Sequence, residues 1–137
     1  MNSKEKLIQD NYKKVNQISA RCMRVIVAIL ALAFLYCYFG TDMDDSVLIV
    51  FFASAIFIAL IPTLIINILK FDHAPVTKHI VIICVCLIAT LMLTLLSTYA
   101  YPIMLFPILL ASLYYNQTLV LFASLLMSCG IVVSNYF

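Results

Sequence analysis

The chain has 137 residues, of which 66% belong to the apolar set AVILMFWYC and only 10% are charged. A water-soluble domain needs roughly a quarter of its residues charged to cover its surface, so this composition excludes an ordinary soluble globule. The net charge of +2 is unevenly distributed, because six of the eight Lys and Arg residues fall in the first 24 positions. From His79 to Phe137 there is no Asp, Glu, Lys or Arg, which excludes a nucleic-acid face and paired-carboxylate catalysis in that part.

Residues 1–24 form the one long polar stretch. Apolar residues recur in it at helical spacing, at Leu7, Ile8, Tyr12, Val15, Ile18 and Cys22. Asn2 and Glu5 have the spacing of a capping box. Two interpretations remain open for this basic amphipathic helix: it lies on the membrane surface, or it is a solvated helical lead-in to the first span. Both give the same topology.

Five apolar segments follow and predict an all-α polytopic membrane protein, with a bundle of about five transmembrane helices over residues 22–137. The predicted spans are about 22–39, 46–69, 80–96, 100–115 and 118–136. The fourth is the least regular, because Pro107 in its interior removes a helical hydrogen bond and clashes with the preceding turn. We therefore expect the fourth helix to bend or open near Met104–Pro107, and a re-entrant segment is the alternative.

Basic residues in short flanks stay on the cytoplasmic side of a membrane. The basic N-terminal stretch and the loop that carries Lys70 and Lys78 are therefore predicted to lie inside, and the acidic loop Gly40–Asp45 outside. Five crossings place Phe137 outside, directly after an apolar helix, so we expect the chain to be truncated. The predicted location is the cell membrane, multi-pass, with a cytoplasmic N-terminus and the lipid bilayer as the first partner.

Two groups of potential metal ligands occur in the loops. The first comprises Asp42, Asp44 and Asp45, and the second comprises Asp72, His73 and His79. Clustered carboxylates suit hard cations, and two histidines with a carboxylate suit zinc or iron. However, the outer turn offers few further oxygens, and the histidines stand six residues apart across a proline, so no helix aligns them. We expect no metal, cofactor or catalytic site, and we interpret the five cysteines as small buried thiols.

The predicted spans contain no Asp, Glu, Lys or Arg apart from Arg24 near an edge, whereas transporters usually place ionisable groups at the midplane. Mild polar residues in the spans are expected to form hydrogen bonds between helices: Ser54, Thr63, Thr90, Thr94, Ser112, Ser124 and Ser128. Tyrosines near segment ends suit the headgroup zone: Tyr36, Tyr38, Tyr99, Tyr101, Tyr114, Tyr115 and Tyr136. A few residues could line a pocket for an apolar ligand, although lipid contact is their ordinary role: Phe51, Phe52, Phe57, Met92 and Met104.

Three short sequence stretches are more specific. They are Lys13-Lys14-Val15-Asn16, Ser112-Leu113-Tyr114-Tyr115-Asn116 and Ser134-Asn135-Tyr136-Phe137. In this layout the chain resembles the multi-span N-terminal input region of bacterial signalling proteins, namely GGDEF-type diguanylate cyclases and methyl-accepting chemotaxis receptors of Gram-positive bacteria. One difference is that the family tends to place a basic residue after the Asn, where this chain has Gln117-Thr118.

The resemblance implies six spans followed by a cytoplasmic output domain, and any catalytic activity would belong to that domain. The sequence therefore predicts the membrane-embedded sensor or anchor region of a signal-transduction protein, truncated before its sixth span and paired as a homodimer by helix packing. Its mechanism would be a small helix shift that biases the output domain. The alternative is a small integral-membrane transporter or channel subunit, which needs a polar pore lining.

Overall fold

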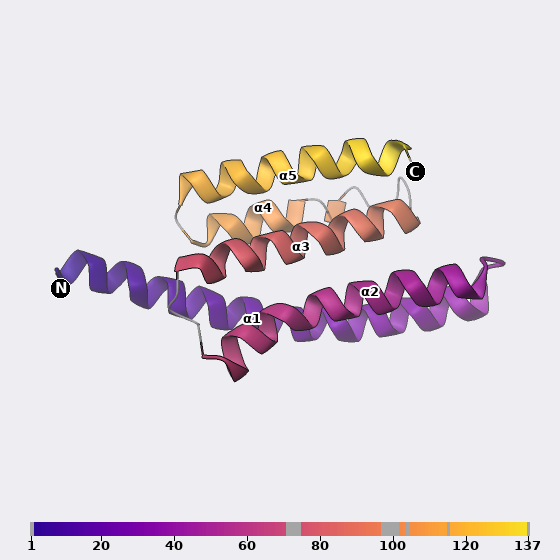
Figure 1. Ribbon diagram of the computed structural model, residues 1–137, viewed down its shortest axis with the longest axis horizontal. Coiled ribbons are helices and arrows are strands. Elements are labelled where there is room, and N and C mark those ends of the chain that lie inside the picture. The colour runs from indigo at the N-terminus through magenta and orange to yellow at the C-terminus, as the bar shows by residue number, and fades with distance from the viewer. Residues whose placement is uncertain (1, 71–74, 97–101, 104, 115, 137) are drawn as a thin grey trace.

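The computed structural model describes residues 2–70, 75–96, 102–103, 105–114 and 116–136, and every regular element there is helical. The main elements are α1 (Ser3–Gly40), α2 (Asp45–Thr63), the π-helix η1 (Leu64–Ile68), α3 (Pro75–Leu96), α4 (Leu105–Ser112) and α5 (Gln117–Tyr136). The helices α1, α3 and α5 run in one direction and α2 and α4 in the other (Figure 1). This arrangement is the predicted all-α bundle.

Four stretches of helix are long and apolar enough to cross a membrane, namely α1, α2 with η1, α3 and α5. Of these, α3 is the most enclosed, because 61% of its apolar window is buried, against 17% to 28% in the other three. Large apolar side chains cover the outer faces of the others, for example Leu32 on α1 and Leu125 on α5. A surface of this kind is favourable in hydrocarbon and unfavourable in water, so the chain has the build of a multi-pass membrane protein.

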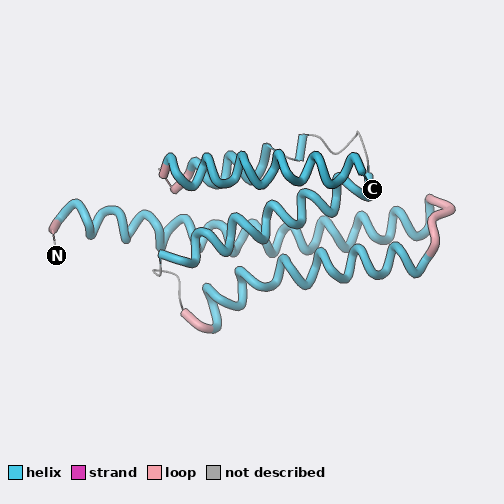
Figure 2. Tube along the Cα trace, turned by 45° about the horizontal axis from the view of Figure 1, so that its top comes forward, coloured by secondary structure: helices cyan, strands magenta, loops and turns pink. Residues whose placement is uncertain are grey.

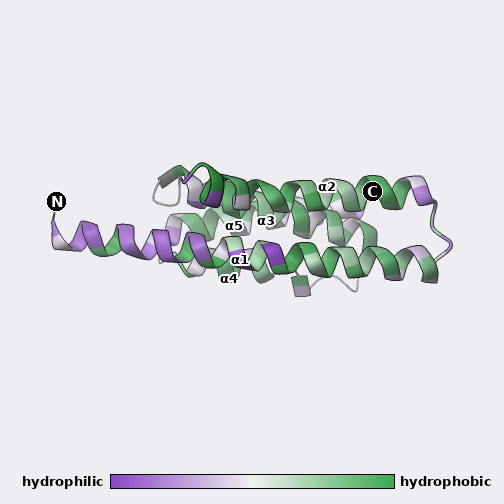
Figure 3. Cartoon of the chain, turned by 90° about the horizontal axis from the view of Figure 1, so that it is seen from below, coloured by the Kyte–Doolittle hydropathy of each residue, from purple (hydrophilic) through white to green (hydrophobic). Residues whose placement is uncertain are grey.

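α1 is a single helix of 38 residues that joins the polar stretch to the first apolar segment. Its start has the predicted capping box, in which the backbone N–H of Asn2 donates to Glu5 Oε2 at 3.4 Å. Its polar first turns project beyond the other helices (Figure 3), and burial begins at Val15. The unbroken helix agrees with the lead-in alternative, because a helix lying on the surface has to turn where the span begins.

Two prolines in the first half of the bundle show how position decides their effect. Pro62 lies inside α2, where it cannot donate to the carbonyl one turn back, and the helix widens into η1 two residues later. Pro75 is the first residue of α3, where its missing N–H has no partner to lose. The tube in Figure 2 shows η1 ending in the loop that leads to α3.

The predicted span at about 100–115 is described only in part, and its described α-helix is shorter than a full crossing, so the five crossings stay a prediction. Among the described residues, a short 3₁₀ turn at Pro102 and Ile103 precedes α4, which has only 8 residues and reaches about 12 Å. Pro107 is the third residue of α4, in the first turn, where its missing N–H costs least. Met104, where the expected opening begins, lies outside the described residues.

The hydroxyl groups in the spans bond within their own helices, not between helices as expected. Thr90 Oγ1 donates to Cys86 O at 2.8 Å, and the same four-residue pattern holds for Ser54, Thr94, Ser124 and Ser128. Ser112 bonds three residues back. The reason is that a carbonyl of the preceding turn is always within reach of a Ser or Thr side chain. Thr63 differs, because its Oγ1 is buried without a hydrogen-bond partner at the start of η1.

Candidate functional site

A cluster of polar side chains joins α1 to α3 and to the turn after α4, at the end of the bundle from which α1 projects. We call it the α1–α3 polar cluster. Its members are Tyr12, Asn16, Ser19, Lys78 and Tyr114. Asn16 and Ser19 are completely buried, Tyr114 is 1% exposed and Lys78 is 8% exposed. Buried polar groups need partners, and these residues supply them to one another.

Tyr114 is the centre of the cluster. Its hydroxyl donates to Asn16 Oδ1 at 2.5 Å, across 98 positions of sequence. Tyr114 lies in the turn between α4 and α5, outside the four membrane-capable helices. The pKa of its hydroxyl is raised to about 12, because the upward effect of burial is larger than the downward effect of a hydrogen bond with Ser19. Tyr114 therefore stays neutral at physiological pH and fixes the α4–α5 turn against α1.

Lys78 supplies the positive charge of the cluster. Its Nζ donates to the Tyr12 hydroxyl at 3.1 Å and lies 4.3 Å from the centre of the Tyr12 ring. A cation in this position is attracted both by the phenol oxygen and by the negative face of the ring. The Tyr12 and Tyr114 rings lie 6.0 Å apart, so the two halves of the cluster are in contact.

Local sequence explains why these groups meet. On α1, Tyr12, Asn16 and Ser19 are spaced by four and three residues, so they share a helix face with the buried Val15 and Met23. Lys78 stands one turn into α3, and the enclosed position of that helix carries the lysine stem inward. The chemistry available is hydrogen bonding and one positive charge. These contacts fix α1 relative to α3 and to the α4–α5 turn. The five side chains of the cluster include no nucleophile–base pair.

Two loops carry the potential metal ligands, and among the described residues no set of three His, Cys, Asp or Glu side chains lies close enough to hold an ion. In the α1–α2 loop, Asp44 caps α2 by accepting a hydrogen bond from the Ser46 backbone at 3.1 Å, and Asp42 and Asp45 are exposed. This is the behaviour of turn acids. Asp72 and His73 lie outside the described residues.

The remaining sequence candidates have structural surroundings. The His79 ring packs edge-on against Phe122 at 6.0 Å between centres. All five cysteines are free thiols; three are buried, Cys22 is half-buried, and Cys129 is exposed, against the expectation that all five are buried.

The polar cluster is the feature that sequence reasoning missed. Tyr114 was expected in the headgroup zone with the other tyrosines, but it is buried, whereas Tyr36 and Tyr136 are exposed near the other end of the bundle. Lys78 was assigned only a topological role. The available signal was on α1, where two polar residues, Asn16 and Ser19, interrupt the apolar stripe on the face that turns inward.

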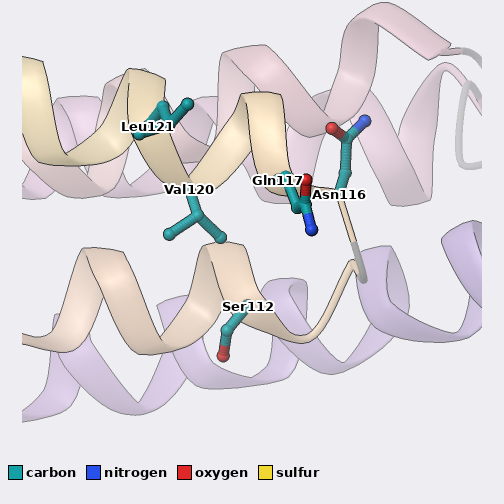
Figure 4. Close-up of a pocket in the computed structure, with 5 residues that line it drawn as sticks. All are labelled: Ser112, Asn116, Gln117, Val120 and Leu121. Carbon is teal, nitrogen blue, oxygen red and sulfur yellow. The ribbon is translucent and has the colours of Figure 1, made fainter.

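A shallow hollow of about 570 Å³ lies beside the cluster, between α4 and α5. It is lined by Ser112, Asn116, Gln117, Val120 and Leu121. Figure 4 shows Val120 and Gln117 extending from α5 towards α4, and Leu121 extending the other way. Asn116 already caps α5, since its Oδ1 accepts from the Leu119 backbone at 3.3 Å. The hollow is a widening at the α4–α5 turn.

Comparison with family models, with curated proteins and with solved structures gives no match for this chain.

Proposed function

We propose that this chain is the membrane-embedded input region of a bacterial signal-transduction protein. It acts as a homodimer, it has no catalytic activity of its own, and it works by a small displacement of α1 relative to α3 and the α4–α5 turn. The single observation that carries the proposal is the contact between Tyr114 and Asn16.

That contact matters because it joins two of the sequence stretches on which the resemblance rests. Asn16 ends the stretch that begins at Lys13, and Tyr114 lies in the stretch that ends at Asn116. The two are 98 residues apart and have no local reason to meet. This hydrogen bond links α1 to the α4–α5 turn. A helix-displacement mechanism needs such a link, because α1 either moves together with the turn while the bond is formed or moves away from it when the bond breaks.

The proposed orientation places the polar cluster at the cytoplasmic side. The first turn of α3 with Lys78, the lysine-bearing first turns of α1 and the end of η1 next to the exposed Lys70 lie at the end of the bundle where α1 projects, and the acidic α1–α2 loop lies at the other end (Figure 1). Because α1 and α5 run in the same direction, reporter fusions after Asp72 are expected to be cytoplasmic and fusions after Phe137 external. A cytoplasmic Phe137 fusion contradicts this orientation.

The experiment that tests the proposal is to sequence the gene beyond codon 137. We expect an open reading frame that continues into a sixth apolar segment and a cytoplasmic output domain. A stop codon directly after Phe137, together with solute or ion flux through the purified chain in proteoliposomes, contradicts the proposal and favours the transporter alternative.

A second measurement tests the mechanism in the full-length gene product. Tyr114→Phe removes the hydrogen bond to Asn16 and keeps the ring, so we expect the basal activity of the output domain to change while the amount in the membrane stays constant. Tyr136→Phe is the matched control, because Tyr136 is 86% exposed. Equal activity of the Tyr114→Phe variant, the Tyr136→Phe variant and the unmodified protein contradicts the mechanism.

A further inference from the structure

A second cavity lies in the apolar part of the bundle, apart from the polar cluster. Its volume is about 500 Å³, within the range of small-molecule sites, and its lining is almost entirely apolar. Its lining comes from α1 between Ile26 and Ala33, from α3 between Val85 and Met92, and from Pro102, Ile103 and Phe106. We call it the α1–α3 groove.

The depth of the groove follows from its position on α1. Ile26 and Ala33 stand 10 and 17 residues beyond Asn16 of the polar cluster, which corresponds to roughly 15 and 25 Å along the helix axis. The groove residues on α3, from Val85 to Met92, likewise lie within the apolar span Val76–Leu95, in its second half. Both measures place the groove in the hydrocarbon core of a bilayer, whose thickness is about 30 Å.

The groove lies beside the start of α4, which begins at Leu105 among the described residues of the fourth apolar segment. Pro102 and Ile103 stand in a 3₁₀ turn instead of a helix that would pack along α1 and α3. The groove is open on one side, since Ile29 is 57% exposed, Ile103 39% and Phe106 37%. Its lining is therefore continuous with the surface that α1 presents to lipid.

We propose that the α1–α3 groove binds a single lipid acyl chain. An apolar cavity at this depth and open to the side is filled by the hydrocarbon around it, because a void loses the contacts of its lining and water finds no polar partner there. A partner helix fits less well. Close helix packing in membranes needs small residues at the contact, whereas bulky side chains stand at the mouth: Ile29, Ile103 and Phe106.

The sequence pointed to a part of this site. Met92 was among the residues that could line an apolar pocket, and it lines the groove. Of the others, Phe52 is buried and packs against Phe34 at 5.5 Å, and Phe57 is 70% exposed. The acyl-chain site does not depend on the signalling role proposed above.

The test uses the full chain in phosphatidylcholine vesicles that contain a small fraction of phosphatidylcholine with a photoreactive diazirine in the middle of one acyl chain. After illumination, mass spectrometry locates the adducts. We expect the yield in the peptides around Ile29 and Ile88 to be severalfold higher than around Leu125, a residue that faces lipid without a groove. Equal labelling of all lipid-facing segments overturns the proposal.

Two variants make the test specific. Ala33→Phe fills the groove, and Ala31→Phe adds the same ring to an exposed position on the same helix. We expect the first to lower groove labelling severalfold and the second to leave it unchanged. If Ala33→Phe fails to fold, Ile103→Phe closes the mouth instead, with the exposed Leu109→Phe as its control. Unchanged labelling in the groove variants overturns the proposal.

Discussion

α3 and the segment that follows it have nearly the same apolar composition and very different structures. α3 is 22 residues long and has one proline, at its first position, while the next segment has prolines at 102 and 107 and an α-helix of 8 residues. α3 packs against α2 on one side and α5 on the other and is the most buried helix. Two residues of α4, Leu105 and Leu109, are instead more than half exposed.

This difference shows that apolar composition and proline position have separate effects on a segment. Apolar composition decides that a segment belongs in lipid, because both segments are equally unfavourable in water. Proline position decides whether the backbone completes its hydrogen bonds there as a long helix. The described 3₁₀ turn at Pro102 and Ile103 lies at the α1–α3 groove, beside α1 and α3.

The largest effect is expected from the contact that holds α3 against α5. A Cβ added to Gly130 would lie 2.5 Å from Thr90 Oγ1, and that hydroxyl is held by its bond to Cys86 O at 2.8 Å. Overpacking of this kind costs about 1–3 kcal/mol, so Gly130→Ala should lower the free energy of unfolding by that amount. Unfolding in mixed micelles measures it.

Two controls isolate that contact. Gly40→Ala adds the same methyl group where nothing lies within 4 Å, so it should be neutral or slightly stabilising. Thr90→Ala removes the hydroxyl and should recover most of the stability lost in Gly130→Ala. If the double variant is as unstable as Gly130→Ala alone, the α3–α5 contact at Thr90 is not the cause.

The next effect concerns the end of α4, where Tyr114 ties the turn to α1. Its pKa in the folded protein is about 12, above the ordinary value of 10.0, so the folded state favours the neutral hydroxyl. The resulting stabilisation is complete below pH 10 and is lost as the pH rises from about 10 to about 12, by on the order of 2 kcal/mol. Measurements of unfolding as a function of pH should show this loss of stability. The Tyr114→Phe variant, which has no ionisable hydroxyl at this position, should lack the part of the loss that Tyr114 causes. An identical pH profile in that variant contradicts the assignment.

Much of the fold was predictable from the sequence for physical reasons. The long apolar runs gave α2, α3 and α5 to within a few residues, because only a helix satisfies its backbone in lipid. The exact start of α3 was missed by one turn, since Pro75 was placed in the loop although it suits a first helical position. The fourth segment was predicted to open near Pro107, but its short helix was not foreseen.

The candidate site was much less predictable than the fold. Tyr and Asn occur at many positions in membrane proteins, so neither residue type marks a site. The contact between Tyr114 and Asn16, which are 98 positions apart, depends on how distant parts of the chain pack. The spacing of apolar residues shows which face of α1 is buried, but it does not show which residues pack against that face. The hydroxyl groups illustrate the same limit, since each could bond either to its own helix or to a neighbour.

A smaller effect tests the first turn of α3. Lys78→Ala removes the hydrogen bond and the ring contact with Tyr12 and should destabilise the fold by about 1–2 kcal/mol. The control is Lys70→Ala, because Lys70 is exposed and should change stability by less than about 0.5 kcal/mol. Chemical unfolding of both variants in one detergent measures the difference. Equal stability of the two variants means that the contact seen at Tyr12 contributes nothing.

The smallest effect on stability comes from the proline that distinguishes the two segments. Pro107→Ala restores a backbone N–H, so that α4 can extend towards Ile103; the gain in stability should stay below about 1 kcal/mol because the present helix start tolerates proline. The sharper readout is hydrogen exchange, which should slow at residues 105 and 106 as new helical bonds form. Pro75→Ala is the matched control, since the first position of α3 gains no bond and exchange at residues 76–78 should not change. Unchanged exchange at residues 105 and 106 means that Pro107 does not set the start of α4, and Pro102 becomes the residue to replace.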